Sequence, residues 1–158
     1  MEAQQNGTNP AVQKLKEWNA SAVAQVIEFR GETTVVVPRQ HLLGAAELLA
    51  DEPSLRFSFL SDLSAVDRFP LEPRFEVNYH LLSIEKRLRL RLKVKLSTAD
   101  PVVHSVTQIW PTANWHEREV FDMFGILFEA HPDLRRILMP DDWEGHPLRK
   151  DYPTEGYR

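Results

Sequence analysis

The stretch 87–96 alternates strictly between basic and apolar side chains, and this pattern constrains the fold more than any other in the chain. Every odd position is Arg or Lys, and every even position is Leu or Val. Successive side chains of a β-strand point to opposite faces, so the pattern predicts a strand with one cationic face and one buried face. Its expected neighbour is the stretch 75–81, where four apolar residues alternate with Glu76, Asn78 and His80.

The remaining pattern mixes helices and strands. Asn9 and Pro10 are suited to begin a helix, and a second apolar helical pattern spans 42–51. Stretches 23–29 and 33–37 predict a hairpin, and 55–63 predicts a further strand. We expect a loop over 63–73 and a short helical stretch between Pro101 and Ile109. This order lacks regular βαβ alternation, which favours a two-layer α+β domain with a mixed, largely antiparallel sheet.

Three segments are expected along the chain. Residues 1–9 are polar and are predicted to be a flexible N-terminus, and residues 10–127 are predicted to form the α+β domain. Residues 128–158 are rich in Pro, Gly and charge, which predicts an extended arm. Trp143, Tyr152 and Tyr157 are large amphipathic residues on this arm. We therefore expect the arm to become ordered against a partner protein.

Composition narrows the classes of function. The chain has no cysteine, which excludes disulfides and the thiolates that hold most iron–sulfur clusters. No apolar run is long enough to cross a bilayer, and the polar N-terminus does not resemble an export signal, so a cytoplasmic location is expected. The net charge of -4 gives no overall attraction to nucleic acid or anionic lipid.

The basic strand face leaves two readings open. Five cations on one face could follow the phosphates of a nucleic acid. Single-strand binders usually add stacking aromatic residues, whereas the neighbours here are Glu76, Asn78 and His80. We favour a solvated or protein-covered face, and any protein that covers it should be acidic.

The stretch 115–124 predicts a compact helix that carries several charges. Asn114 and Glu117 have the spacing of a capping box, and Gly125 is suited to the position that ends the helix. Glu117 falls within the apolar face and is expected to be partly buried. On the opposite side, Arg118 and Asp122 have the spacing of an ion pair.

The carboxylates of this helix suggest two alternatives. Glu117, Glu119 and Asp122 could perform acid–base chemistry in an independent hydrolase, but the sequence indicates no substrate pocket. We favour a structural network in which Glu117 pairs with an arginine or shifts its pKa. The candidate partners are Arg135, Arg136, Arg149 and Lys150. His116, His131 and His146 match no compact metal-ligand spacing, so a metal site is not expected.

The C-terminal third resembles a known family. The residues that carry the resemblance are 115–126 (WHEREVFDMFGI), 131–138 (HPDLRRIL) and 147–153 (PLRKDYP). They are similar to the C subunit of bacterial complex I, in the family that includes the mitochondrial 30-kDa subunit. A weaker resemblance extends upstream through 31–38 and 60–67. Ala130 departs from the family, which commonly has glycine before the His-Pro pair.

The resemblance implies a scaffold subunit in the peripheral arm of a proton-translocating NADH:quinone oxidoreductase. The partners would be the quinone-site (D) subunit together with the B and I subunits, on the cytoplasmic side of the bacterial inner membrane. No cofactor would belong to this chain, since the iron–sulfur clusters, flavin, NADH and quinone would belong to its partners. The alternative is the same scaffold in a membrane-bound hydrogenase, formate hydrogenlyase or ferredoxin-dependent dehydrogenase.

Thirteen residues are expected to serve structure or partner docking. They are Glu117, Arg118, Glu119, Asp122, His131, Asp133, Arg135, Arg136, Trp143, Arg149, Lys150, Asp151 and Tyr152.

Overall fold

A computed structural model describes residues 9–156. Of the predicted flexible N-terminus, only Asn9 lies within this range. Tyr157, which was predicted to be an anchor on the arm, also lies outside it. In chain order the elements are α1 (Pro10–Trp18), η1 (Ala20–Ala22), β1 (Gln25–Phe29), β2 (Glu32–Val36), η2 (Arg39–His41), α2 (Leu42–Asp51), β3 (Phe59–Asp67), β4 (Phe75–Ser83), β5 (Leu88–Leu96), β6 (Val102–His104), α3 (Ala113–Phe124) and β7 (Leu127–Glu129).

The main sheet has five strands in the order β1-β2-β5-β4-β3. All neighbours in it are antiparallel except β2 and β5, which pair in parallel. The separate strands β6 and β7 also pair in parallel. The sheet is therefore mixed and largely antiparallel, and the predicted α+β class is confirmed.

The strand with alternating basic and apolar residues forms β5 and pairs with β4 along its whole length, from Phe75 opposite Leu96 to Ser83 opposite Leu88. The apolar residues of both strands belong to the hydrophobic core or pack against it, except Leu82, which lies on the other face. On the other face, His80 lies opposite Arg91, and Asn78 lies opposite Lys93. This neighbourhood agrees with the sequence prediction.

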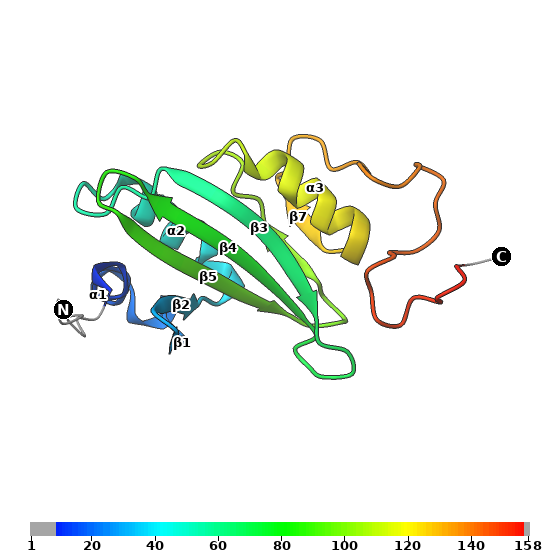
Figure 1. The fold of residues 1–158 in the computed structure, drawn as a ribbon, viewed down its shortest axis with the longest axis horizontal. Coiled ribbons are helices and arrows are strands. Elements are labelled where there is room, and N and C mark those ends of the chain that lie inside the picture. Colours follow the sequence, from blue (N-terminus) through cyan, green and yellow to red (C-terminus); the bar gives the residue numbers. More distant parts are fainter. Residues whose placement is uncertain (1–8, 157–158) are drawn as a thin grey trace.

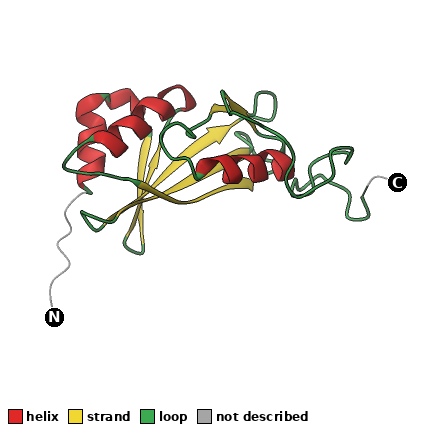
Figure 2. Cartoon of the chain, turned by 90° about the horizontal axis from the view of Figure 1, so that it is seen from above, coloured by secondary structure: helices red, strands yellow, loops and turns green. Residues whose placement is uncertain are grey.

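The core lies on the apolar face of the sheet. It includes Leu15 of α1, Leu42 and Leu49 of α2, and Val120 of α3. The side chain of Asn9 accepts a hydrogen bond from the Ala11 amide at the start of α1, as its position predicted. Figure 2 shows α1 and α2 together at one end of the sheet and α3 at the other end.

Two predicted elements are wrong. Residues 63–67 continue β3 along β4 and are not a loop: the polar Ser64 lies opposite Asn78, and Asp67 is buried opposite Phe75. The stretch after Pro101 begins with β6 and not with a helix. A three-residue strand carries too little periodicity to be recognised in a sequence.

After β7 the chain forms no further helix or strand within the described residues, in agreement with the predicted extended arm. Figure 1 shows this arm leaving the body in a wide loop and returning near the end of α3. The predicted domain boundary at residue 127 falls at the first residue of β7. Ala130, where the family commonly has glycine, has a φ of 61° and so adopts the left-handed conformation that glycine favours.

None of the helices in residues 9–156 has the length and apolar character that crossing a membrane requires.

Candidate functional site

Helix α3 connects the body to the arm. It packs along β3 of the main sheet on one side. Two of its carboxylates, Glu117 and Asp122, are fully buried. Each is hydrogen-bonded to a different segment of the chain, so the helix joins parts that are distant in sequence.

Glu117 fastens the segment that precedes α3. Its Oε1 accepts a hydrogen bond from the Val106 amide at 2.8 Å, and its Oε2 accepts one from the Ser105 hydroxyl at 2.7 Å. The capping-box prediction is therefore wrong: the N-cap residue of α3 is Thr112, and no side chain caps the helix. The other end is as predicted, since Gly125 ends α3 with a φ of 74°.

His131 lies beside Glu117, with Nε2 at 3.8 Å from Oε2. The Asp133 amide donates a hydrogen bond to Nδ1 of His131, so Nδ1 is an unprotonated acceptor. The Nε2–H group then donates to the Asn114 carbonyl at 3.1 Å. His131 thus holds the first turn of the arm against α3 through its two ring nitrogens.

The environment of Glu117 disfavours its charged form. Burial raises its pKa to about 7, although the hydrogen bonds from Val106 and Ser105 oppose the shift. Tyr79 is also fully buried, its hydroxyl has no hydrogen-bond partner in the described residues, and burial together with the Glu117 charge raises its pKa well above the ordinary value. Of the two sequence alternatives for Glu117, a shifted pKa holds and pairing with an arginine does not.

The raised pKa predicts a stability that depends on pH. Between 4.5, the ordinary value, and about 7, folded Glu117 binds more protons than it does in the unfolded chain, so the free energy of unfolding falls as the pH rises through this window. Between about pH 5 and pH 8 we expect the free energy of unfolding of the wild type to fall by about 3 kcal/mol relative to that of Glu117→Gln.

Urea unfolding of both proteins at the two pH values measures this difference. Glu119→Gln, on the exposed side of the same helix, is the control and should follow the wild type. Parallel stability curves for the wild type and Glu117→Gln would show that Glu117 does not titrate in this window.

Asp122 fastens the middle of the arm. Its Oδ2 accepts hydrogen bonds from three consecutive arm amides, those of Ile137, Leu138 and Met139, at 2.7–3.1 Å. Its Oδ1 accepts one from Arg136 at 2.7 Å. Burial alone would raise the pKa of Asp122, but these hydrogen bonds outweigh burial and hold it below its ordinary value.

Arg118 also binds the arm. The predicted pair between Arg118 and Asp122 does not form, because Asp122 is buried under the arm. The Arg118 guanidinium instead donates to the carbonyls of Arg135 and Arg136, and it stacks over the ring of Trp115 at 5.3 Å. Arg135 pairs with Asp133 on the surface at 2.7 Å.

The end of the arm returns to the C-terminus of α3. Arg149 donates a hydrogen bond to the Phe124 carbonyl at 2.5 Å, and His146 donates one to the Asp122 carbonyl at 2.9 Å. A Cβ atom at Gly125 would lie 2.6 Å from the Arg149 guanidinium and 2.7 Å from the His146 ring. Glycine is therefore required here for close approach as well as for its positive φ.

A second anchor, which the sequence did not reveal, holds residues 150–151 on the main sheet. Asp67 at the end of β3 pairs with the buried Arg74 at 2.8 Å and accepts a hydrogen bond from the Lys150 amide. Arg74 also pairs with Asp151 at 2.8 Å. Asp67 and Arg74 looked like the edges of a loop, and no local pattern indicates a partner so distant in sequence.

The predicted docking residues thus divide into two groups. Six of them hold the arm to the body through the contacts above (Arg118, Asp122, His131, Arg136, Arg149 and Asp151), and Glu117 holds the segment that precedes α3. Glu119, Asp133, Arg135, Trp143 and Lys150 lie on the surface, and Tyr152 is half-buried near the arm's end. The hydrogen bonds to Glu117 come from Ser105 and Val106 and not from the four basic residues proposed as its partners.

Large apolar side chains are exposed along α3 and the arm. Trp115 is 63% exposed, Trp143 is 41% exposed, and Leu138 and Leu148 are more than half exposed. Exposed aromatic residues on a rigid support are typical of protein interfaces. The two buried carboxylates, by contrast, are saturated by donors from the chain itself, and residues 9–156 contain no group of three side chains that could hold a metal ion.

Comparison with known proteins agrees with this arrangement. Residues 35–158 match the model of the family described as respiratory-chain NADH dehydrogenase, 30 Kd subunit. The C subunit of the NADH-quinone oxidoreductase of Citrifermentans bemidjiense is 51% identical over 148 residues, which cover 94% of this chain and 91% of that protein. The C subunit of the Roseiflexus castenholzii enzyme is 53% identical over 146 residues, which cover 92% of this chain and 84% of that protein.

Two solved structures share the fold. A trypsin-resistant fragment of Nqo5 superposes with a TM-score of 0.66 and 33% identity, covering 78% of this chain and 99% of the fragment. A chain of the membrane-bound sulfane sulfur reductase, an archaeal respiratory membrane complex, superposes with a TM-score of 0.75 and 25% identity. The superposition covers 92% of this chain and 85% of that chain. From the family match and these identities, the chain belongs to the respiratory-chain NADH dehydrogenase 30-kDa subunit family.

Proposed function

We propose that this chain is the C subunit of an NADH-quinone oxidoreductase and serves there as a scaffold without a redox centre of its own. The observation that carries the proposal is the surface of exposed apolar side chains on α3 and the arm, which we call the arm surface (Trp115, Leu138, Trp143 and Leu148). Such a surface is stabilised when another protein covers it. Relatives about half identical in sequence are named as this subunit.

The arrangement of the arm supports docking to more than one neighbour. Because the arm runs outside the body and is fixed at Asp122 and Asp67, it presents its residues on a surface separate from the sheet. We propose the quinone-site (D) subunit as the main partner, with the B and I subunits beside it, on the cytoplasmic side of the membrane. The solved Nqo5 relative is described as a trypsin-resistant fragment, and a protease-resistant body with a separate arm is consistent with this role.

A second candidate is the same scaffold in a different respiratory complex. The observation that favours it is the similarity to a chain of the archaeal sulfane sulfur reductase complex over nearly the whole of this protein. Purification of the tagged chain from its host, followed by identification of the bound subunits, separates the two candidates. A flavin-bearing NADH-oxidising subunit in the purified assembly supports the first, and its replacement by hydrogenase or sulfur-reductase subunits supports the second.

Removal of the exposed tryptophans should weaken assembly without unfolding the chain. We expect Trp115→Ala combined with Trp143→Ala to lower the amount of assembled complex, because each central aromatic residue of an interface contributes about 2 kcal/mol, or about 30-fold in affinity. Native gel analysis and NADH:quinone reductase activity of membranes measure the loss.

The matched control is Ile84→Ala. Ile84 is 66% exposed, but it lies in the β4–β5 turn away from the arm surface. The control should assemble normally, and all three proteins should unfold at the same urea concentration. Full assembly of the double variant would exclude the arm surface as the docking site. The purified chain alone is expected to oxidise no NADH.

A further inference from the structure

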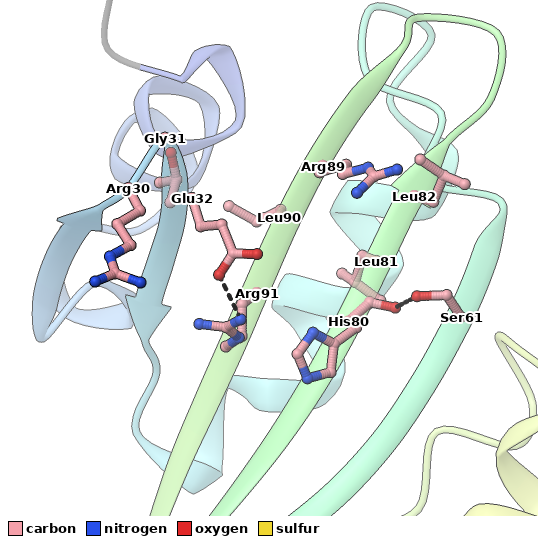
Figure 3. A pocket seen from close by; sticks show the side chains of 11 residues that line it. Arg30, Gly31, Glu32, Ser61, His80, Leu81, Leu82, Arg89, Leu90 and Arg91 are labelled. Carbon is pink, nitrogen blue, oxygen red and sulfur yellow. Dashed lines mark hydrogen bonds and ion pairs between the residues drawn. The ribbon is translucent and has the colours of Figure 1, made fainter.

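A groove opens on the polar face of the sheet, away from the arm surface. Strands β2 and β5 are paired only from Thr34–Val36 to Arg91–Lys93, so they separate toward the β1–β2 hairpin. The resulting groove has a volume of about 610 Å³. Figure 3 shows its walls, with Glu32 on one side and Arg91, Arg89 and His80 on the other.

The groove carries positive charge that the chain itself does not neutralise. Arg91 pairs with Glu32 at 2.7 Å and donates a hydrogen bond to Thr34. Arg89 makes no side-chain hydrogen bond or ion pair with residues 9–156. Arg30, at the hairpin, has no ion pair in the same range and stacks on the ring of Phe29 at 5.1 Å. Two guanidinium groups are therefore available, although the whole chain has a net charge of -4.

The groove also has an apolar part. Leu82, which is half-buried, lies beside Arg89 in Figure 3 and is part of the lining. Phe29, at the end of β1 next to Arg30, is 65% exposed. The groove and its rim thus offer apolar contacts, Leu82 and Phe29, beside the cationic side chains of Arg89 and Arg30.

A nucleic acid fits this groove less well than an acidic polypeptide. The Glu32 carboxylate lies within the groove, where it would repel a phosphate backbone. The groove lining contains no Phe, Tyr or Trp, the side chains on which single-strand binders usually stack bases. A polypeptide tolerates both features, because its carboxylates are separated by neutral groups and its apolar side chains can contact Leu82.

We propose that this groove docks an extended acidic segment of a partner protein, with carboxylates on Arg89 and Arg30 and apolar side chains against Leu82. The bidentate geometry of guanidinium with carboxylate suits such recognition. The site lies on the sheet and shares no residue with the arm surface, so the proposal goes beyond the proposed function. Together the two surfaces would let the protein bind two partner segments at once.

The test uses the purified full chain and two labelled probes. One is a fluorescein-labelled peptide of about ten residues built on the repeat Glu-Ser-Leu-Ser, which places Glu and Leu on the same face of an extended segment. The other is an oligothymidine of about the same length. Fluorescence anisotropy at low and at moderate salt gives the affinities. We expect the peptide to bind with an affinity that falls as salt rises, and the oligothymidine not to bind.

Matched charge reversals locate the binding. Arg89→Glu should weaken peptide binding about tenfold or more, because it replaces an attraction by a repulsion inside the groove. Arg87→Glu makes the same change of charge in the exposed β4–β5 turn outside the groove lining and should leave the affinity within about twofold. Circular dichroism of both variants checks that the fold is retained.

Three outcomes would overturn the proposal. They are the absence of peptide binding, an equal loss of affinity in both variants, and tighter binding of the oligothymidine than of the peptide. None of these outcomes depends on whether the chain assembles into a respiratory complex, so the test separates the groove from the proposed function.

Discussion

An Asp122→Ala variant is expected to release the middle of the arm while the body stays folded. The substitution removes the acceptor of three consecutive amides and leaves the largely buried Arg136 without its carboxylate. Loss of one partner from a buried, hydrogen-bonded ion pair costs about 3–5 kcal/mol. We expect this cost to appear mainly as local opening of the arm, because the arm contributes little to the hydrophobic core.

Limited trypsin digestion measures the release. Cleavage after Arg135 and Arg136 depends on how often the arm opens, so the variant should be cut at least about 100-fold faster than the wild type. Glu119→Ala, on the exposed side of the same helix, is the control and should be cut at the wild-type rate. Equal cleavage rates for Asp122→Ala and the wild type would mean that other contacts hold the arm.

The second large effect is expected at Asp67. An Asp67→Asn variant should lower the free energy of unfolding by about 3–5 kcal/mol, because it leaves the Arg74 guanidinium buried with one partially exposed partner, Asp151. Burial opposes ionisation of Asp67, but the hydrogen bonds from Arg74 and from the amides of Lys150 and Phe69 outweigh it and hold the pKa of Asp67 well below its ordinary value.

Urea unfolding at neutral pH measures the loss. Asp151→Asn, which removes the other carboxylate bound to Arg74, is the control. It should lower the free energy of unfolding by about 1 kcal/mol, because the Asp151 side chain is nearly half exposed. The depressed pKa also predicts that the stability provided by Asp67 is present above about pH 4 and is lost as the pH falls below it. Equal losses in the two variants would mean that burial does not strengthen the Asp67–Arg74 pair.

Sequence periodicity predicted the pairing of β4 and β5 well because polar and apolar residues alternate from Phe75 to Leu81 and from Leu88 to Leu96. The same reasoning predicted burial of Glu117, whose position on the helical wheel depends only on the spacing of residues in α3. The capping box at Asn114 failed because its signature is local, whereas Glu117 is bonded to Ser105 and Val106.

The anchors of the arm could not be predicted from the sequence. Asp67 and Lys150 are joined across 83 positions, and Arg74 and Asp151 across 77. Such contacts depend on how β3 and β4 end relative to α3, and a single sequence contains no local signal for this. The presence of an extended arm was evident from its proline and glycine residues, but the residues that hold it became evident only in the structure.

The way the arm is held has a thermodynamic consequence. Its fastenings are charged hydrogen bonds to backbone amides, which fix a defined path without burying much apolar area. The conformational entropy of the arm is therefore largely lost when the chain folds, before any neighbour arrives. A partner that meets such a preorganised arm avoids most of that ordering cost, so more of the contact free energy remains as affinity.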